Sequence, residues 1–341
     1  MNIEELNKTA KAMMAKGLLA MDESIGTCNR RFAELGIPQT EEYRRNYREI
    51  LVTTPDIGSC LSGAILSDET IRQHTSDGTS FVEVLVKSGI IPGIKVDKSA
   101  KDMAGFPGEK ITEGLDGLRE RLKEYYNLGA RFAKWRAVIK IGDGIPTKGC
   151  IEANTNSLAL YAALCQEAGI VPMVEPEVLM DGTHTIERCA SVTEEVHRSL
   201  FHQLYEQRVN LLGIILKPNM ILPGKDCPVQ VDDDTIANAT VDCLLRSVPA
   251  AVPGIAFLSG GQPSIKATSR LNAMHSKNRS PLPWSLTFSF SRAIEYPAIE
   301  IWRGNKDFIN AAQKALYHRA CCDNAARHGE YNAAMEASEE R

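Results

Sequence analysis

A lysine closes an apolar run in the middle of the chain. In the stretch GIILKPNM, the apolar residues 214–216 lead to Lys217, and Pro218 follows. The run has the length and composition of a strand that is buried on both faces. Lysine is seldom found in such a place unless it is paired or has a chemical role. Lys217 is therefore the first candidate for a functional residue.

Charged, hydroxyl and glycine residues also stand within or directly after most of the other apolar runs. They are Asp22, Lys95, Lys134, Arg136, Glu175, Glu177, Ser259, Gly260, Gly261, Ser289 and Arg292. Residues two apart on a strand point to the same face, so Lys134 shares a face with Arg136, and Glu175 with Glu177. Each residue by itself is more commonly a solvated rim residue or half of a structural ion pair. Because nearly every run ends in this way, we interpret the residues jointly as one functional site.

The joint set suits an anionic carbonyl substrate. The turn 259–261 and Arg292 are suited to one phosphate, and Lys95 to a second anionic group. A lysine close to other cations has a lowered pKa, and its free amine can attack a ketone to form a Schiff base. The iminium then accepts electrons when a neighbouring carbon–carbon bond breaks, and carboxylates can carry the protons. The pattern favours a carbon–carbon lyase acting on a phosphorylated ketose, without deciding which lysine is the nucleophile.

Eight apolar runs have the length of strands. They cover residues 17–21, 63–67, 91–96, 132–141, 170–178, 211–217, 254–259 and 285–290. Helical patterns follow most of them, for example at 157–169, 192–209 and 235–248. Strands and helices that alternate with short connections indicate a parallel sheet, and eight such units indicate an α/β fold closed into a (β/α)8 TIM barrel. An open doubly wound sheet is the structural alternative, but no GxGxxG motif follows any run.

A barrel of this kind would gather the site residues in one place. Its chemistry lies at the C-terminal ends of the strands, which is where these residues stand. The sequence contains no low-complexity segment and no linker rich in proline or serine. We therefore expect one catalytic barrel domain over residues 1–341, with an N-terminal helix and a short C-terminal tail.

Composition excludes several classes of protein. The chain has 341 residues, 43% of them hydrophobic, and a net charge of -4 without a basic block, which argues against nucleic-acid binding. No apolar run is long enough to span a bilayer, and the N-terminus reads as a polar amphipathic helix rather than a signal peptide. The nine cysteines are scattered, as in a cytoplasmic protein with reduced thiols. The seven histidines have no metal-ligand spacing, so we expect neither a metal nor another cofactor.

Six longer motifs resemble those of the class I fructose-bisphosphate aldolases. They are LLAMDES, GIKVDK, GLDGLRERLKEYYNLGARFAKWR, VPMVEPEVLMDGTH, LKPNM and FLSGGQ, and the resemblance runs from near residue 10 to about residue 331. It implies a (β/α)8 barrel that is usually a homotetramer and uses no metal. It also implies reversible cleavage of fructose 1,6-bisphosphate to dihydroxyacetone phosphate and glyceraldehyde 3-phosphate.

The resemblance implies a role for each residue that matches a family motif. Lys217 would form the Schiff base, and Glu175 would move protons while that bond forms and is hydrolysed. Glu177 would be the partner of Glu175 near the lysine, and Asp22 would take the proton from the C4 hydroxyl during cleavage. The cationic residues implied along the substrate channel are Lys134 and Arg136.

Two phosphate sites are implied in the same way. The site on the dihydroxyacetone side consists of Ser259, Gly260, Gly261, Ser289, Ser291 and Arg292. The surroundings of the other phosphate are Ser24, Thr27 and Lys95. A basic pair near the mouth of the site is formed by Arg30 and Arg31.

The sequence departs from animal members of the family in two places. They read serine–tyrosine–glycine–arginine where this chain reads SFSR, so Phe290 and Ser291 replace the tyrosine and the glycine. The Ser291 amide could donate to phosphate if that position does not need a positive φ. Animal members also end in a tail whose final tyrosine helps to protonate the enamine. Here the sequence ends in EASEER after Tyr331, which predicts slower protonation or another proton donor.

Alternatives remain open at this level. Sedoheptulose 1,7-bisphosphate is a possible second substrate, because its extra carbon would lie in an open channel. A non-catalytic scaffold on the same fold would not need Lys217, Glu175, Lys134 and Asp22 together. A transaldolase would not need two phosphate sites. Oxidation of Cys28, which is next to Thr27, could inhibit the enzyme, although an inert thiol is the simpler interpretation.

Overall fold

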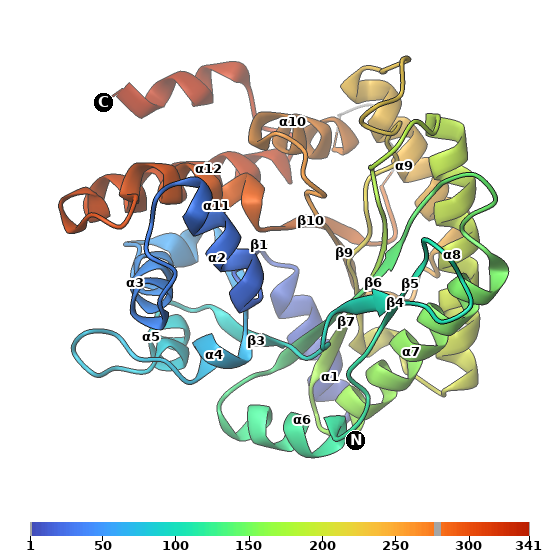
Figure 1. Ribbon diagram of the computed structural model, residues 1–341, viewed down its shortest axis with the longest axis horizontal. Coiled ribbons are helices and arrows are strands. Elements are labelled where there is room, and N and C mark those ends of the chain that lie inside the picture. The colour runs from blue at the N-terminus through green and yellow to red at the C-terminus, as the bar shows by residue number, and fades with distance from the viewer. Residues whose placement is uncertain (1, 276–280, 341) are drawn as a thin grey trace.

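Parallel strands form a closed barrel at the centre of the molecule (Figure 1). The computed structural model describes residues 2–275 and 281–340. The barrel order is β1-β10-β9-β8-β7-β6-β3-β2, and every neighbouring pair in the register is parallel. The strands are β1 (Gly17–Ala20), β2 (Leu61–Leu66), β3 (Ile91–Lys95), β6 (Phe132–Ile139), β7 (Val171–Val178), β8 (Ile215–Leu216), β9 (Gly254–Phe257) and β10 (Ser285–Phe290). The predicted TIM barrel is confirmed.

Helices surround the barrel (Figure 1). They are α1 (Ile3–Met13), α2 (Ile25–Glu34), α3 (Glu41–Val52), α4 (Asp68–Ile71), α5 (Phe81–Lys87), α6 (Leu118–Asn127), α7 (Lys148–Glu167), α8 (Ile186–Glu206), α9 (Asp233–Ser247), α10 (Ser264–Met274), α11 (Arg292–Trp302) and α12 (Ile309–Ala326). Side chains in the preceding loops begin several of them. Thr147, Thr185 and Asp232 each accept a hydrogen bond from a backbone N–H in the first turn of α7, α8 and α9. No helix in the described ranges is long and apolar enough to cross a membrane.

The predicted strand 211–217 is wrong in its first half. Leu211–Gly213 form a 3-10 helix, η2, and β8 has only two residues. The side chain of Gln166, on α7, explains the difference. Its amide nitrogen donates to the carbonyls of Asn210 and Gly213, and its oxygen accepts from the Asn210 N–H. Because these backbone groups are satisfied by a side chain, the segment turns instead of joining the sheet.

A short hairpin was not predicted. β4 (Ala100–Asp102) pairs with β5 (Lys110–Thr112) in antiparallel fashion, outside the barrel. Asn154, on α7, holds it in place by donating to the Lys110 carbonyl at 2.8 Å. Three-residue strands without a buried alternating face leave little periodicity for a sequence to display.

Two apolar cores position the site. The larger one fills the space between the strands and the outer helices. The smaller one lies inside the barrel, where Leu6, Ala10, Met13 and Met14 of α1 and its C-terminal cap pack on inward side chains such as Phe132 and Met173. Helix α1 closes the N-terminal end of the barrel interior. The polar residues at the other end of the strands line a cavity.

Candidate active site

A cavity of about 760 Å3 opens at the C-terminal ends of the barrel strands. It brings together sixteen of the predicted site residues. They are Asp22, Ser24, Thr27, Arg31, Lys95, Lys134, Arg136, Glu175, Glu177, Lys217, Ser259, Gly260, Gly261, Ser289, Ser291 and Arg292. Arg30 is exposed on α2 and is not among the lining residues, because its neighbour Arg31 occupies the buried face of that helix.

Four buried charged groups form a chain across the floor of the cavity. The Nζ of Lys134 lies 2.6 Å from Oδ2 of Asp22 and 3.3 Å from Oε2 of Glu175. The other oxygen of Glu175 lies 3.5 Å from the Nζ of Lys217. All four side chains are buried. Glu175 therefore stands between two amines, one within β6 and one directly after β8.

The two lysines experience different electrostatic surroundings. Burial, with help from the positive charge of Lys134, lowers the pKa of Lys217 despite the nearby Glu175. At Lys134 burial acts in the same direction, but Asp22 and Glu175 outweigh it and raise its pKa. For Asp22, burial is outweighed by Lys134 and Lys217, which lower its pKa to about 2. The Lys217 amine thus loses its proton more readily than that of an ordinary lysine, whereas Lys134 holds its proton more tightly.

A second set of ion pairs organises the wall formed by β3, β6 and β7. Arg136 pairs with Glu177, and this partner raises the pKa of Arg136 against the effect of burial. Lys95 donates to Oδ1 of Asp97 at 2.5 Å, and the Arg136 amide donates to Oδ2 of Asp97 at 3.3 Å. Asp97 was not singled out from the sequence, although it is two residues after Lys95 and lines the cavity. Asp97 therefore holds the Lys95 side chain and the Arg136 backbone next to each other.

The opposite wall has the features of an anion site. Gly260 and Gly261 adopt φ values of 59° and 87°, which glycine tolerates and which turn the backbone sharply after β9. The buried Ser289 hydroxyl has no hydrogen-bond partner among the described residues. Ser291 has φ -110°, so this position does not need the positive φ that favours glycine. A polar ligand in the cavity would satisfy the Ser289 hydroxyl.

A buried network behind this wall was also missed from the sequence. Arg31 contacts both Glu23 and Glu295, and its Nη2 donates to the Ser291 hydroxyl at 3.2 Å. The Ser291 hydroxyl donates in turn to Glu295 at 3.1 Å, and Arg48 pairs with Glu23 at 2.6 Å. Burial and the charge of Glu23 raise the pKa of Glu295 well above its usual range. Glu23 could have been found from the sequence, because it directly follows Asp22 in the motif MDES. Glu295 lies within a helical stretch, and nothing in the sequence marks it as part of the site.

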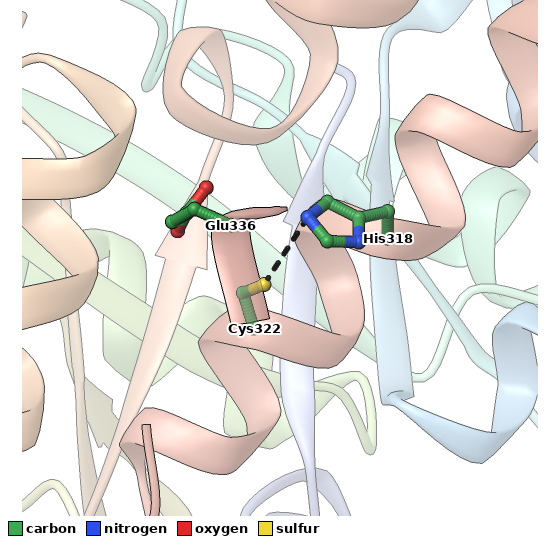
Figure 2. Close-up of side chains that lie close together, drawn as sticks. All are labelled: His318, Cys322 and Glu336. Atoms are coloured by element: carbon green, nitrogen blue, oxygen red, sulfur yellow. Dashed lines mark hydrogen bonds between the residues drawn. The ribbon is translucent and has the colours of Figure 1, made fainter. Parts of the chain in front are cut away.

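One group of possible metal ligands lies outside the cavity. His318, Cys322 and Glu336 bring one ligand atom each within 4.8 Å of one another (Figure 2). The carboxylate of Glu336 is already engaged, since Arg319 donates to its two oxygens at 2.7 and 2.6 Å. A guanidinium in that position opposes a cation. No histidine is among the described residues that line the cavity.

Comparison with known proteins agrees with this geometry. The family "Fructose-bisphosphate aldolase class-I" matches residues 5–341. A probable fructose-bisphosphate aldolase class 1 of Xanthomonas axonopodis pv. citri (strain 306) is 57% identical over 325 residues, covering 94% of this chain and 96% of the relative. Fructose-bisphosphate aldolase 5, cytosolic, of Arabidopsis thaliana is 50% identical over 330 residues, covering 96% and 92%.

A solved structure is similar over the same extent. It is the fructose-bisphosphate aldolase of Plasmodium falciparum in complex with TRAP and a small molecule inhibitor. It has a TM-score of 0.95 and 43% identity, and the match covers 97% of this chain and 96% of that one. The family match and the relatives each span nearly the whole chain, and the solved structure has the same architecture. The chain therefore belongs to the class I fructose-bisphosphate aldolases, which are lyases.

Proposed function

We propose that this aldolase cleaves fructose 1,6-bisphosphate reversibly to dihydroxyacetone phosphate and glyceraldehyde 3-phosphate through a Schiff base on Lys217. The observation that carries the proposal is the buried Lys217 amine, whose pKa is lowered and which lies 3.5 Å from Glu175. A neutral amine is the form that attacks a ketone. The family resemblance independently assigns this role to the same lysine.

Schiff-base formation needs protons to move at one place in the cavity. The Lys217 amine adds to the C2 carbonyl, and the resulting carbinolamine loses water to give an iminium. We assign the proton transfers to Glu175, because its carboxylate faces both Lys217 and Lys134. Glu177, paired with Arg136, would keep a negative charge beside this carboxylate and support the developing iminium.

Cleavage needs a base at the other end of the breaking bond. We assign this role to Asp22, which would take the proton of the C4 hydroxyl as the C3–C4 bond breaks. The bonding electrons then pass into the iminium and give an enamine, while the C4 oxygen becomes the aldehyde. Lys134, 2.6 Å from Asp22, stabilises the carboxylate form that must accept the proton. The two phosphates would bind at Ser259–Gly261 with Arg292, and near Lys95.

Borohydride trapping tests the assignment directly. The protein is incubated with dihydroxyacetone phosphate in EDTA, reduced, digested and analysed by mass spectrometry. We expect an adduct on Lys217, no adduct in Lys217→Arg, and an unchanged adduct in the control Lys225→Met, which removes an amine at the cavity rim that pairs with Asp181. No adduct together with loss of cleavage in EDTA would favour metal chemistry, and no activity under any condition would favour a scaffold.

We also infer activity on sedoheptulose 1,7-bisphosphate. The support is the open cavity, which has room beyond the charged floor for one more hydroxymethylene group. Comparing kcat/KM for the two bisphosphates measures the preference. A ratio of about one hundred or more in favour of fructose 1,6-bisphosphate, about 2.7 kcal/mol, would remove this substrate from the proposal.

The remaining expectations concern the molecule as a whole. We infer that one catalytic domain assembles as a homotetramer and acts in the cytoplasm on phosphorylated sugars, without a metal or another cofactor. The support is the family resemblance and the name "cytosolic" of the Arabidopsis thaliana relative. Light scattering on a sizing column measures the assembly, and a monomer at physiological concentration would contradict it.

A further inference from the structure

Helix α12 lies along the segment that leads into β2. Three side chains spaced four residues apart on α12 meet this segment in order. Gln313 donates to the Thr53 hydroxyl at 3.0 Å, and the Tyr317 hydroxyl lies 3.3 Å from that of Ser59. One turn further, the Sγ of Cys321 lies 3.0 Å from the Sγ of Cys60. The neighbouring contacts fix the register of the helix, so the two sulfurs are held together by the fold.

The Cys60 thiol differs from the other cysteines in the direction in which its pKa is shifted. The Cys321 thiol, assisted by Ser59 and Lys16, outweighs burial and lowers the pKa of Cys60 to about 7. Burial instead raises the pKa of Cys28 to about 11 and that of Cys243 to about 12. Because the thiolate is the nucleophile, Cys60 is a better target than Cys28 beside the cavity. Cys321 is partly exposed, which opens a path for a small reagent.

We propose that Cys60 and Cys321 form an oxidation site, at which a small hydroperoxide converts the two thiols into a disulfide. The Cys60 thiolate attacks the O–O bond, forms a sulfenic acid and releases the alkoxide or hydroxide, which takes up a proton. The Cys321 sulfur then attacks the sulfenic sulfur, loses its proton and displaces water. Two thiols and one hydroperoxide thus give one disulfide, one alcohol (water, from hydrogen peroxide) and one water.

Formation of the disulfide requires little movement of the protein. A disulfide bond is about 2 Å long, so the sulfurs must approach by about 1 Å. The Cys60 backbone is anchored, since its carbonyl accepts from the Gly17 N–H at the start of β1. Closing the gap therefore falls to the side chains and to α12, which the Tyr317 contact already aligns.

The disulfide would cross-link distant parts of the chain. The bond would join residues 261 apart in sequence, linking the entry to β2 with the long helix near the C-terminus. Cross-linking so large a loop restricts the unfolded chain and stabilises the fold. Cys60 stands at the N-terminal end of β2, whereas the cavity opens at the C-terminal ends. We therefore expect the oxidised enzyme to be more heat-resistant and to keep its activity.

Peptide mapping after oxidation tests the site. The folded protein is treated with hydrogen peroxide, its free thiols are alkylated, and it is digested without reduction. We expect a peptide linking Cys60 to Cys321, reversed by dithiothreitol, and a rise of about 5 °C in the unfolding midpoint. Cys321→Ser should lose both effects. Cys322→Ser, which changes the next residue on the same helix, should keep them.

Several outcomes would overturn the site. Cys60 recovered as a sulfinic acid, or alkylated at peroxide levels that oxidise other cysteines, would show that Cys321 does not resolve it. A disulfide between two chains, or the same shift in the unfolding midpoint for Cys321→Ser, would contradict an intramolecular disulfide. If Cys321→Ser does not fold, mapping of the wild-type chain still decides, because it reports which sulfurs are joined. Loss of cleavage that follows disulfide formation would contradict the expected separation from the active site.

Discussion

At the scale of residues, the candidate active site shifts the pKa values of two buried lysines in opposite directions. Lys217 and Lys134 share Glu175, at 3.5 and 3.3 Å. Asp22 adds a second negative charge, which lies 2.6 Å from the Nζ of Lys134. Burial and the charge of Lys134 lower the pKa of Lys217, whereas Asp22 and Glu175 outweigh burial at Lys134 and raise its pKa.

The first residue-scale prediction concerns pH. Burial and Lys134 lower the pKa of Lys217, so its neutral fraction reaches a plateau at a lower pH than that of an ordinary lysine, whose pKa is 10.5. The rate of adduct formation with dihydroxyacetone phosphate should rise with pH and level off below that value. Lys134→Met removes a repelling charge and frees Glu175, so the profile should shift to higher pH. A profile that stays in place would show that Lys134 does not influence the amine.

The second residue-scale prediction separates binding from bond cleavage. Asp22→Asn removes the proposed base, so kcat for fructose 1,6-bisphosphate should fall about 100-fold or more. Trapping of dihydroxyacetone phosphate on Lys217 should remain, because that step does not use Asp22. The control is Asp181→Asn, which changes a carboxylate at the cavity rim that pairs with Lys225. Equal losses in cleavage and in trapping would assign Asp22 to the architecture of the site instead.

At the scale of elements, the start of α11 is tied to α2 through buried polar groups. Ser291 precedes α11, and its hydroxyl bonds to Arg31 of α2 and to Glu295 one turn into α11. Glu295 is completely buried. Its raised pKa means that the neutral acid is favoured, which avoids a second buried negative charge beside Glu23. These contacts hold two cavity residues, Arg31 and Ser291, at fixed positions.

If Glu295 is a neutral acid, a neutral side chain of the same shape should replace it at little cost to substrate binding. Glu295→Gln keeps the shape and an acceptor oxygen, so KM for fructose 1,6-bisphosphate should stay within about twofold. Glu295→Ala leaves Arg31 and Ser291 without their common partner, and KM should rise about 10-fold while kcat changes less. Glu300→Gln, on an exposed turn of the same helix, serves as the control. If the Gln and Ala variants were equally impaired, the buried carboxyl would be acting as an anion.

At the scale of the whole molecule, α1 closes the end of the barrel that the active site does not use. Leu6, Ala10 and Met13 are buried against inward side chains from several strands. A TIM barrel is filled by such side chains in layers, so a residue that completes a layer carries packing energy. The floor of the active site rests on this interior.

The whole-molecule prediction is a loss of stability far from the cavity. Leu6→Ala should reduce the free energy of unfolding by about 3 kcal/mol, since it leaves a cavity at the base of the barrel. The urea midpoint should fall, while Lys8→Ala on the exposed face of α1 should leave it unchanged. An equal midpoint for the two variants would mean that α1 is not part of the cooperative fold.

The sequence alone predicted the barrel architecture, which the structure confirms, and a set of site residues, sixteen of which line one cavity. Period and spacing predicted the eight strands, and the placing of charges after apolar runs predicted that Lys217, Glu175, Lys134 and Asp22 would converge. This works because the two properties are local: a strand buried on both faces must be apolar along its length, and its polar end must lie at the rim.

Only the tertiary structure decided how those groups are paired. Gln166 turned the first half of one predicted strand into a 3-10 helix, by hydrogen bonds that reach 44 residues along the chain. Glu295 meets Arg31 across 264 residues, and Cys60 meets Cys321 across 261. Such contacts leave no periodic trace, because they depend on which faces of distant elements come together once the barrel closes. The opposite pKa shifts of Lys134 and Lys217 arise in the same way, from burial and neighbours that only the closed barrel provides.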